Sequence, residues 1–194
     1  PTLAARTTRD FIAYAKSNPG KINYASSGIG SPGHLAAVLL ESMAKIQITH
    51  IPYKGGGPAI TDLLAGHVPA FFAVISTGVP HVQAGKVRGI AVTGTRRAEA
   101  VPDVPTIAES GVPGYAATNW YGLLAPAKTP SAVIDRINRD MTAALKSPDV
   151  IENLKARGID AAPNSPAEFA AFIRAESEKW RPIVQQSGIK PDGG

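Results

Sequence analysis

Hydrophobic positions along the first hundred residues follow two different spacings. Short apolar runs have the length of β-strands, and between them lie segments in which apolar residues recur every three or four positions, as in helices. Strands that alternate with helices are typical of βαβ units and of a parallel or mixed sheet, so we predict an α/β fold. The predicted strands are Ile22–Ala25, Ile48–Tyr53, Ala70–Ile75 and Val87–Thr93, and the predicted helices span about 8–17, 33–45, 58–65 and 79–85.

The second half of the chain begins with a passage rich in proline and glycine at 98–116. We expect at most one short helix in it, around Thr106–Ser110, and one more strand after it, at Trp120–Ala125. Apolar residues then recur at helical spacing in three amphipathic segments, each preceded by a hydroxyl residue and a proline, which together cap and start a helix. The predicted helices are 130–146, 148–157 and 166–187, after Thr129-Pro130, Ser147-Pro148 and Ser165-Pro166.

These elements predict three parts of the chain. Residues 5–100 form an α/β lobe, residues 101–118 form a crossing segment, and residues 119–192 form a helix-rich remainder. One strand and three helices cannot easily bury a sheet of their own, so we expect the remainder to belong to a second, incomplete lobe. The chain starts at Pro1 without a basic-then-apolar signal segment, which favours a processed or truncated product.

Composition and charge narrow the classes of function. The absence of cysteine excludes disulfide frameworks, thiolate metal sites and cysteine nucleophiles. The net charge of +5 comes from basic residues spread along the chain with one adjacent pair, Arg96-Arg97, and only 6% of residues are aromatic. Nucleic-acid binding favours clustered cations with stacking aromatics, so we expect no nucleic-acid partner and a diffuse field that attracts small anions. No apolar run is long enough to insert in a membrane.

The most informative motif is a turn between a predicted strand and a predicted helix, Ser26-Ser27-Gly28-Ile29-Gly30-Ser31-Pro32-Gly33-His34. Its glycines have the spacing of the dinucleotide fingerprint, so a nucleotide-dependent α/β enzyme is the alternative function. That fingerprint also expects an acidic residue at the end of the next strand, and Ile51–Lys54 has none. Close backbone approach at glycine, unpaired N–H groups at a helix start and serine hydroxyls suit a carboxylate equally well.

Two further loops share this design. Lys54-Gly55-Gly56-Gly57-Pro58 and Ile75-Ser76-Thr77-Gly78 each follow a predicted strand. Ligands of open α/β sheets bind outside the carboxyl ends of the strands, so the three loops predict one pocket for a small anion. The candidate ligand-binding residues are Ser26, Ser27, Gly28, Gly30, Ser31, His34, Gly55, Gly56, Ser76 and Thr77.

Catalytic and metal chemistry find little support in the sequence. The nucleophile elbow G-x-S-x-G is absent, and the four histidines lack metal-ligand spacing. Ser31 and His34 could form a nucleophile–base pair, but no nearby acid would orient the base. We expect His34, in the first turn of a helix, to be neutral, and His50 and His67 to lie at a strand edge or on the surface. We therefore predict no enzyme activity, no catalytic residues, no bound metal and no cofactor.

Four motifs in order resemble one protein family over about residues 5–192. Residues 22–35 are similar to the second-lobe motif of the tripartite tricarboxylate transporter solute receptors, also called the Bug family of periplasmic binding proteins. Residues 50–59 resemble its "PYKGGxPA" stretch, and Gly89–Thr93 with Val101–Thr106 resembles its "AVTxxxR…PDVPT" stretch. Residues 120–126 resemble the strand that returns to the first lobe.

The resemblance implies a two-lobed, Venus-flytrap receptor of the periplasmic binding protein (type 2) fold. Such a receptor is periplasmic and monomeric, is not an enzyme, and delivers a carboxylate to the permease subunits of a membrane transporter. The second-lobe loop corresponds to Ser26–His34, the loop of the other lobe would precede Pro1, and the lobes would close about Asp103–Tyr115. Apolar Ala73 and Val74, where many relatives carry a polar pair, favour plain mono- or dicarboxylates, including aromatic acids, over amino acids.

Overall fold

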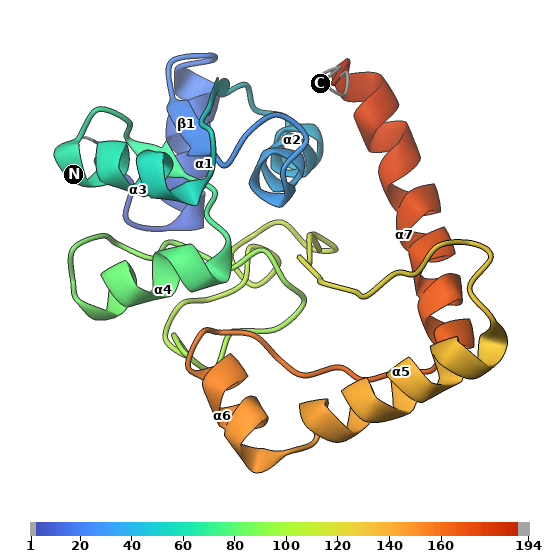
Figure 1. Ribbon diagram of the computed structural model, residues 1–194. Coiled ribbons are helices and arrows are strands. Elements are labelled where there is room, and N and C mark those ends of the chain that lie inside the picture. Colours follow the sequence, from blue (N-terminus) through green and yellow to red (C-terminus); the bar gives the residue numbers. More distant parts are fainter. Residues whose placement is uncertain (1–2, 190–194) are drawn as a thin grey trace.

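The computed structural model describes residues 3–189, and in that range the chain forms three strands and seven helices (Figure 1). The strands and the first four helices lie in the first 83 residues, and the other three helices follow a long passage without regular structure. The elements are α1 (Thr8–Ser17), β1 (Asn23–Ser26), α2 (Pro32–Ala44), β2 (Thr49–Pro52), α3 (Gly56–Ala65), β3 (Ala70–Phe71), α4 (Ile75–Gln83), α5 (Ser131–Leu145), α6 (Pro148–Lys155) and α7 (Pro166–Ser187).

The sheet is parallel, in the strand order β2-β1-β3, which confirms the predicted α/β class. The register places Tyr24 of β1 beside His50 of β2, and Ala25 beside Phe71 of β3. Tyr24 and Ala25 belong to different core clusters, because successive side chains of a strand point to opposite faces. Both faces of the central strand are therefore covered, as expected where helices connect parallel strands.

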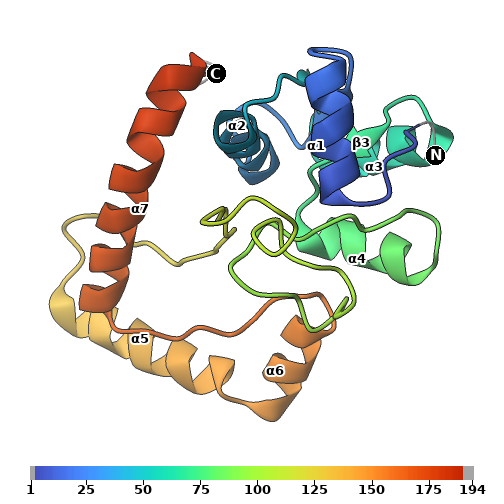
Figure 2. The same ribbon diagram turned by 180° about the vertical axis from the view of Figure 1, so that it is seen from behind.

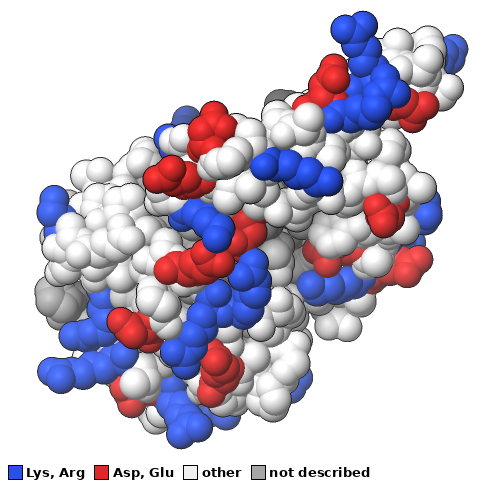
Figure 3. Space-filling model, turned by 90° about the horizontal axis from the view of Figure 1, so that it is seen from below, with Lys and Arg blue, Asp and Glu red and all other residues white. Residues whose placement is uncertain are grey.

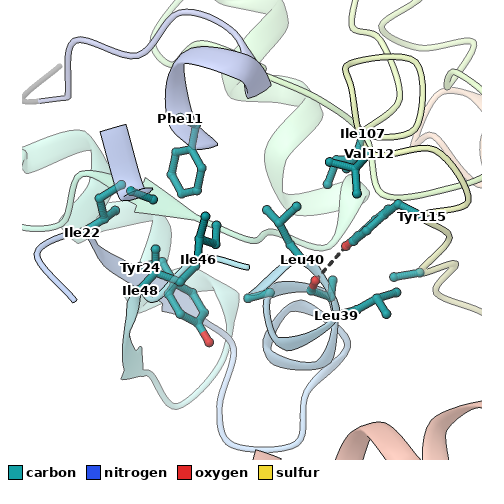
Figure 4. Packing of buried hydrophobic residues seen from close by; sticks show 14 of the residues in the cluster. Phe11, Ile22, Tyr24, Leu39, Leu40, Ile46, Ile48, Ile107, Val112 and Tyr115 are labelled. Carbon is teal, nitrogen blue, oxygen red and sulfur yellow. Dashed lines mark hydrogen bonds between the residues drawn. The ribbon is translucent and has the colours of Figure 1, made fainter. Parts of the chain in front are cut away.

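The main core lies between α1, the sheet, α2 and the passage around residues 104–117 (Figure 4). Phe11, Ile22 and Leu40 are almost fully buried in it. Tyr115 is also buried, and its hydroxyl donates a 2.7 Å hydrogen bond to the carbonyl oxygen of Ala36 in α2. The proline- and glycine-rich passage is thus part of the α/β core, although it has no regular structure of its own.

Several predicted strands are shorter than expected or do not form. The run at 70–75 is a strand only over Ala70–Phe71, and its last residue already begins α4, which extends to Gln83 rather than covering 79–85. The run at 87–93 forms one isolated bridge, from Val92 to Thr106. Thr106–Ser110 is a turn in which Thr106 and Glu109 exchange side-chain-to-backbone hydrogen bonds. An apolar run becomes a strand only where a neighbouring strand pairs with it.

Trp120–Ala125 is not a strand in the described part of the chain, and much of it faces solvent. Tyr121, Leu123 and Leu124 are 70%, 63% and 72% exposed, and none of the three described strands pairs with them. Within residues 3–189 this apolar segment therefore has no partner for strand hydrogen bonds.

The predicted cap is confirmed for α7 but not for α5 and α6. Ser165 accepts a hydrogen bond from the backbone N–H of Glu168, which completes a capping box. Helix α5 begins one residue late, with Pro130 as its N-cap, and the hydroxyl of Ser147 donates back to the carbonyl oxygen of Ala144 instead of capping α6. Proline sets the backbone at a helix start even where the hydroxyl takes another partner.

The three C-terminal helices have no buried residues among those described. Helix α7 runs from the neighbourhood of α5 toward α2, as both ribbon views show (Figures 1 and 2). Near its start, Phe169 and Phe172 meet the ring of Trp120 edge-on, and near its end Trp180 and Ile183 pack against the main core. Helix α7 thus connects the C-terminal region to the α/β region.

Charged side chains are interleaved rather than gathered on the face shown in Figure 3. Exposed ion pairs join distant segments, including Arg96 with Asp160 and Lys155 with Glu99. No helix within residues 3–189 is both long and apolar enough to cross a bilayer.

Candidate functional site

The three predicted site loops lie against one another at the carboxyl end of the sheet. A Cβ atom added at Gly28 would lie 3.2 Å from the carbonyl oxygen of Tyr53, at the end of β2. A Cβ atom at Gly56 would lie 3.1 Å from the hydroxyl oxygen of Thr77, in the first turn of α4. At Gly33 an added Cβ would overlap the carbonyl oxygen of Phe72. The glycines therefore allow the loops after β1, β2 and β3 to pack closely, so that the starts of α2, α3 and α4 meet at one edge.

The hydroxyl of Ser26 fixes the backbone of the first loop through contacts with Gly28. It is fully buried, lies 2.9 Å from the carbonyl oxygen of Gly28, and accepts a 3.1 Å hydrogen bond from the N–H of the same residue. The Nε2 atom of His50 lies 2.6 Å from the same hydroxyl oxygen. Ser26 thus shapes the loop and has no exposed surface with which to touch a ligand.

His34 supports the next part of the loop. The N–H of Gly30 donates a 3.0 Å hydrogen bond to its Nδ1 atom. Its ring stacks on the ring of His50, with centroids 3.8 Å apart and planes 16° from parallel. Burial lowers the pKa of His34, and burial together with the neighbouring His34 lowers the pKa of His50 to about 4. Both rings are neutral near pH 7, as expected for His34 in the first turn of a helix.

His50, which we expected at a strand edge or on the surface, lies on the edge strand β2, but sequence reasoning missed the part it plays. It is half-buried, and its ring stacks against the ring of Tyr24 of β1, with centroids 5.0 Å apart, and against the ring of His34. The contact depends on the parallel register that pairs Tyr24 with His50, which no local motif encodes. His67 is exposed, as expected, and contacts Asp62.

The internal hydrogen bonds change which loop N–H groups can meet a ligand. Those of Gly28 and Gly30 are taken by Ser26 and His34, and that of Ser31 by the carbonyl oxygen of Gly28. No residue in the described range accepts from the N–H groups of Ser27, Ile29 and Gly33. The hydroxyl of Ser31 caps α2 by accepting a long 3.4 Å hydrogen bond from the N–H of His34. Ser27 and Ile29 are at least partly exposed, whereas Gly33 is buried, so free N–H donors remain in the loop that leads into the positive end of α2, where an anion is favoured.

The other two loops present helix starts without side-chain caps. Gly55 has φ +106°, a conformation that favours glycine, and it precedes the first turn of α3. Its N–H donates to the carbonyl oxygen of Ser27, which ties the second loop to the first. Ser76 and Thr77 belong to the first turn of α4 rather than to a loop, because the third strand ends early at Phe71. The hydroxyl of Tyr53 donates a 2.6 Å hydrogen bond to the carboxylate of Asp62 in α3, which fixes the end of β2 to that helix.

The arrangement does not assemble a catalytic or metal centre. Ser26 and His50 have the separation of a nucleophile–base pair, but Ser26 is inaccessible and its oxygen already serves Gly28. Within residues 3–189, no group of three or more histidine or acidic side chains could hold a metal ion. What the loops offer is a set of neutral and partly positive hydrogen-bond donors, which can bind an anion without transforming it.

A hollow of about 2030 Å³ lies between the α/β region and α5, α6 and the first half of α7. Its far walls are mostly apolar and include Trp120, Leu124 and Phe169. Its near wall reaches the candidate site through Gly33 and Gly78, whose neighbours Phe72–Ile75 also line it. None of the candidate ligand-binding residues itself lines the hollow, which meets the site only at residues next to the loops, such as Pro32 and Gly33.

Comparisons with known proteins identify one family over nearly the full length of the chain. Residues 1–189 match the family described as the tripartite tricarboxylate transporter family receptor. Protein BugT of Bordetella pertussis is 34% identical over 190 residues, which are 98% of this chain and 58% of BugT. A Pseudomonas protein from the tcbD–tcbE intergenic region is 37% identical over 180 residues, 92% of this chain and 54% of that protein. The chain thus spans little more than half the length of these relatives.

Solved structures show the same relation. The R. palustris protein Rpa4515, solved with adipate, superposes with a TM-score of 0.87 at 32% identity, covering 98% of this chain and 64% of that one. MatC from Rhodopseudomonas palustris, with bound malate, gives 0.82 at 30% identity, covering 93% and 63%. The fold described above is therefore that of periplasmic binding proteins. The chain belongs to the tripartite tricarboxylate transporter receptor family, whose members bind solutes and are not enzymes.

Proposed function

We propose that this chain supplies one wall of an extracytoplasmic receptor that binds a small carboxylate and delivers it to the permease subunits of a tripartite tricarboxylate transporter. The observation that carries the proposal is the pair of unused N–H groups of Ser27 and Ile29, which are at least partly exposed in the loop that leads into α2. Such a helix start attracts a carboxylate through its N–H groups and its partial positive charge. The relatives solved with adipate and with malate support this ligand class.

The proposed receptor is periplasmic, monomeric and two-lobed, with residues 5–100 as one lobe, 101–118 as the crossing segment and 119–192 as part of the other lobe. The apolar hollow and the exposed Tyr121, Leu123 and Leu124 support this division, because a second lobe needs a sheet over those side chains. The unmatched third of the relatives' chains is long enough to supply one. The predicted contacts of Gly55, Gly56, Ser76 and Thr77 with the ligand belong to the same proposal.

Apolar Ala73 and Val74 support a plain dicarboxylate or an aromatic acid as the ligand. Both line the hollow, and neither side chain offers a hydrogen bond to an amino or hydroxyl group. A ligand with an apolar body and a terminal carboxylate would place the carboxylate at the start of α2 and the body over this wall.

The test is a titration of the ¹⁵N-labelled chain followed by NMR, which detects binding even at millimolar affinity. Adipate, malate, benzoate and NAD are added separately at pH 7.5. We expect a carboxylate to move the amide signals of Ser27, Ile29 and Gly33, and NAD to leave them in place. Movement with NAD and with no carboxylate would instead favour the nucleotide-dependent enzyme and overturn the proposal.

A matched pair of variants at Gly30 then tests the loop. Gly30 has φ +70°, where asparagine is tolerated and a β-branched valine is strained, and an added Cβ would meet no atom within 4 Å. We therefore expect Gly30→Val to weaken carboxylate binding at least about tenfold, a cost of about 1.4 kcal/mol. Gly30→Asn should bind nearly as the original chain does. Equal affinity of the valine variant would exclude this loop from the site.

A further inference from the structure

The stacked histidines beneath the loop have a chemical property that the proposed function does not use. The backbone N–H of Gly30 can only donate a hydrogen bond. The Nδ1 atom of His34, which accepts that bond, must therefore carry no proton. His34 is therefore the neutral tautomer with its proton on Nε2. If Nδ1 were protonated, two donors would face each other across 3.0 Å, and the N–H of Gly30 would lose its acceptor.

Two further features oppose a proton on His34. The residue lies in the first turn of α2, where a positive charge is unfavourable, and α2 has no acidic residue in that turn. Its ring also lies 3.8 Å from the ring of His50, so that two charged rings would repel each other. His50 differs from His34, because a proton on its Nε2 atom could still be donated to the hydroxyl oxygen of Ser26. His34 is thus the member of the pair whose protonation breaks a loop contact.

Solvent protons reach the pair through a recess of about 410 Å³ between α2, β2 and the end of α7. The titratable groups that face it are Tyr24 from β1, Glu41 from α2, and the two histidines. Helix α7 contributes the uncharged Gln186 and Ser187. Glu41 accepts a 2.9 Å hydrogen bond from the N–H of Ile48, and burial raises the pKa of its carboxyl group. A negative charge on Glu41 would favour a protonated histidine, so it would partly offset the unfavourable effect of the start of α2 on a positive charge at His34.

We propose that His34 and His50 are positioning residues that hold the carboxylate loop in its binding geometry, and that protonation of His34 releases Gly30 and lowers affinity for the ligand in acid. The predicted loss of affinity rests on the proposed function. The predicted loss of the contact between His34 and Gly30 concerns the chain without ligand. Burial lowers the pKa of His34, so the loss of affinity begins at a lower pH than it would for an exposed histidine. Below the pKa of His34, affinity falls by up to about tenfold for each pH unit.

The first measurement needs no ligand. In the free ¹⁵N-labelled chain, the amide proton of Gly30 should shift upfield as His34 gains its proton, with the same midpoint as the His34 ring. In His34→Asn the side-chain oxygen can still accept from Gly30 but cannot titrate, so the Gly30 amide should stay fixed between pH 8 and 5. A Gly30 amide that ignores pH in the original chain, or titrates equally in His34→Asn, overturns the proposal.

The second measurement uses adipate and compares the ratio of its affinities at pH 7.5 and pH 5. Adipate itself gains protons in this range, so the ratio is measured in parallel for the original chain, His34→Asn and His67→Asn. We expect the ratio to be largest in the original chain and in His67→Asn, whose histidine is exposed, and clearly smaller in His34→Asn. Equal ratios in all three would overturn the proposal. If no carboxylate binds at pH 7.5, the proposed function fails, while the Gly30 titration still decides the role of His34.

Discussion

The α/β region and the C-terminal helical region use the same kinds of residue in different ways. In the first, apolar side chains of α1, β1, α2 and the 104–117 passage meet in one buried core. In the second, Val133, Ile137 and Met141 have helical spacing on α5 but are 45%, 37% and 43% exposed. An amphipathic pattern makes a core only when a second apolar surface covers it. In the α/β region, the helices and the sheet cover one another's apolar surfaces. In residues 3–189, the apolar face of α5 instead borders the hollow.

The largest expected effect contrasts one residue from each region. Leu40 is 2% exposed in the main core, so Leu40→Ala should lower the free energy of unfolding by about 2–5 kcal/mol. Ile137→Ala removes a partly exposed side chain and should cost less than about 1 kcal/mol. Urea unfolding followed by circular dichroism measures both. Equal losses would mean that α5 is covered in solution and that the two regions do not differ.

A buried hydrogen bond gives the next effect. Tyr115→Phe removes the hydroxyl that donates to the carbonyl oxygen of Ala36 and leaves that acceptor buried, so the free energy of unfolding should fall by about 1–2 kcal/mol. Tyr121→Phe is the matched control in the other region, because its ring is 70% exposed. The control should unfold at the same urea concentration as the original chain. No loss in Tyr115→Phe would show that the passage does not fasten α2.

The smallest expected effect compares two helix caps of the same kind. Thr7 in front of α1 and Ser165 in front of α7 each complete a capping box, and either change to alanine should cost about 1 kcal/mol of local helix stability. Helix α1 lies on the core, so Thr7→Ala should lower the urea midpoint. The start of α7 lies outside it, so Ser165→Ala should speed amide exchange there with a smaller change in the midpoint. Ser147→Ala, which removes no cap bond, is the control. The comparison fails if Ser165→Ala shifts the midpoint as much as Thr7→Ala does.

Helices were predictable from the sequence where local chemistry fixes their ends. The predicted 8–17 and 166–187 agree with α1 and α7, because a capping box and a terminating Asn or Gly act within a few residues. The runs at 87–93 and 120–125 have equally good strand composition, but a strand also needs a partner far along the chain. Composition alone cannot say whether such a partner is present.

The candidate site divides in the same way. The turn at Ser26–His34, the cap at Ser31 and the helix start at Pro32 were predictable, because each depends on neighbours in sequence. The contact of Ser26 with His50 was not, since it depends on the register between β1 and β2. Nor did the glycine spacing reveal that Gly28 and Gly30 donate inward while Ser27 and Ile29 keep free donors. The assignment of individual ligand contacts stays a prediction.

The path of α7 has a consequence for the order of folding. Trp180 and Ile183 of α7 pack against the main core. All other residues of that core lie before residue 118. More than a hundred residues separate the end of α2 from the start of α7. Closing so long a loop costs more chain entropy than the short connections between β1, α2 and β2. We therefore expect the α/β core to form first and α7 to dock last, so that the slowest folding phase reports the environment of Trp180.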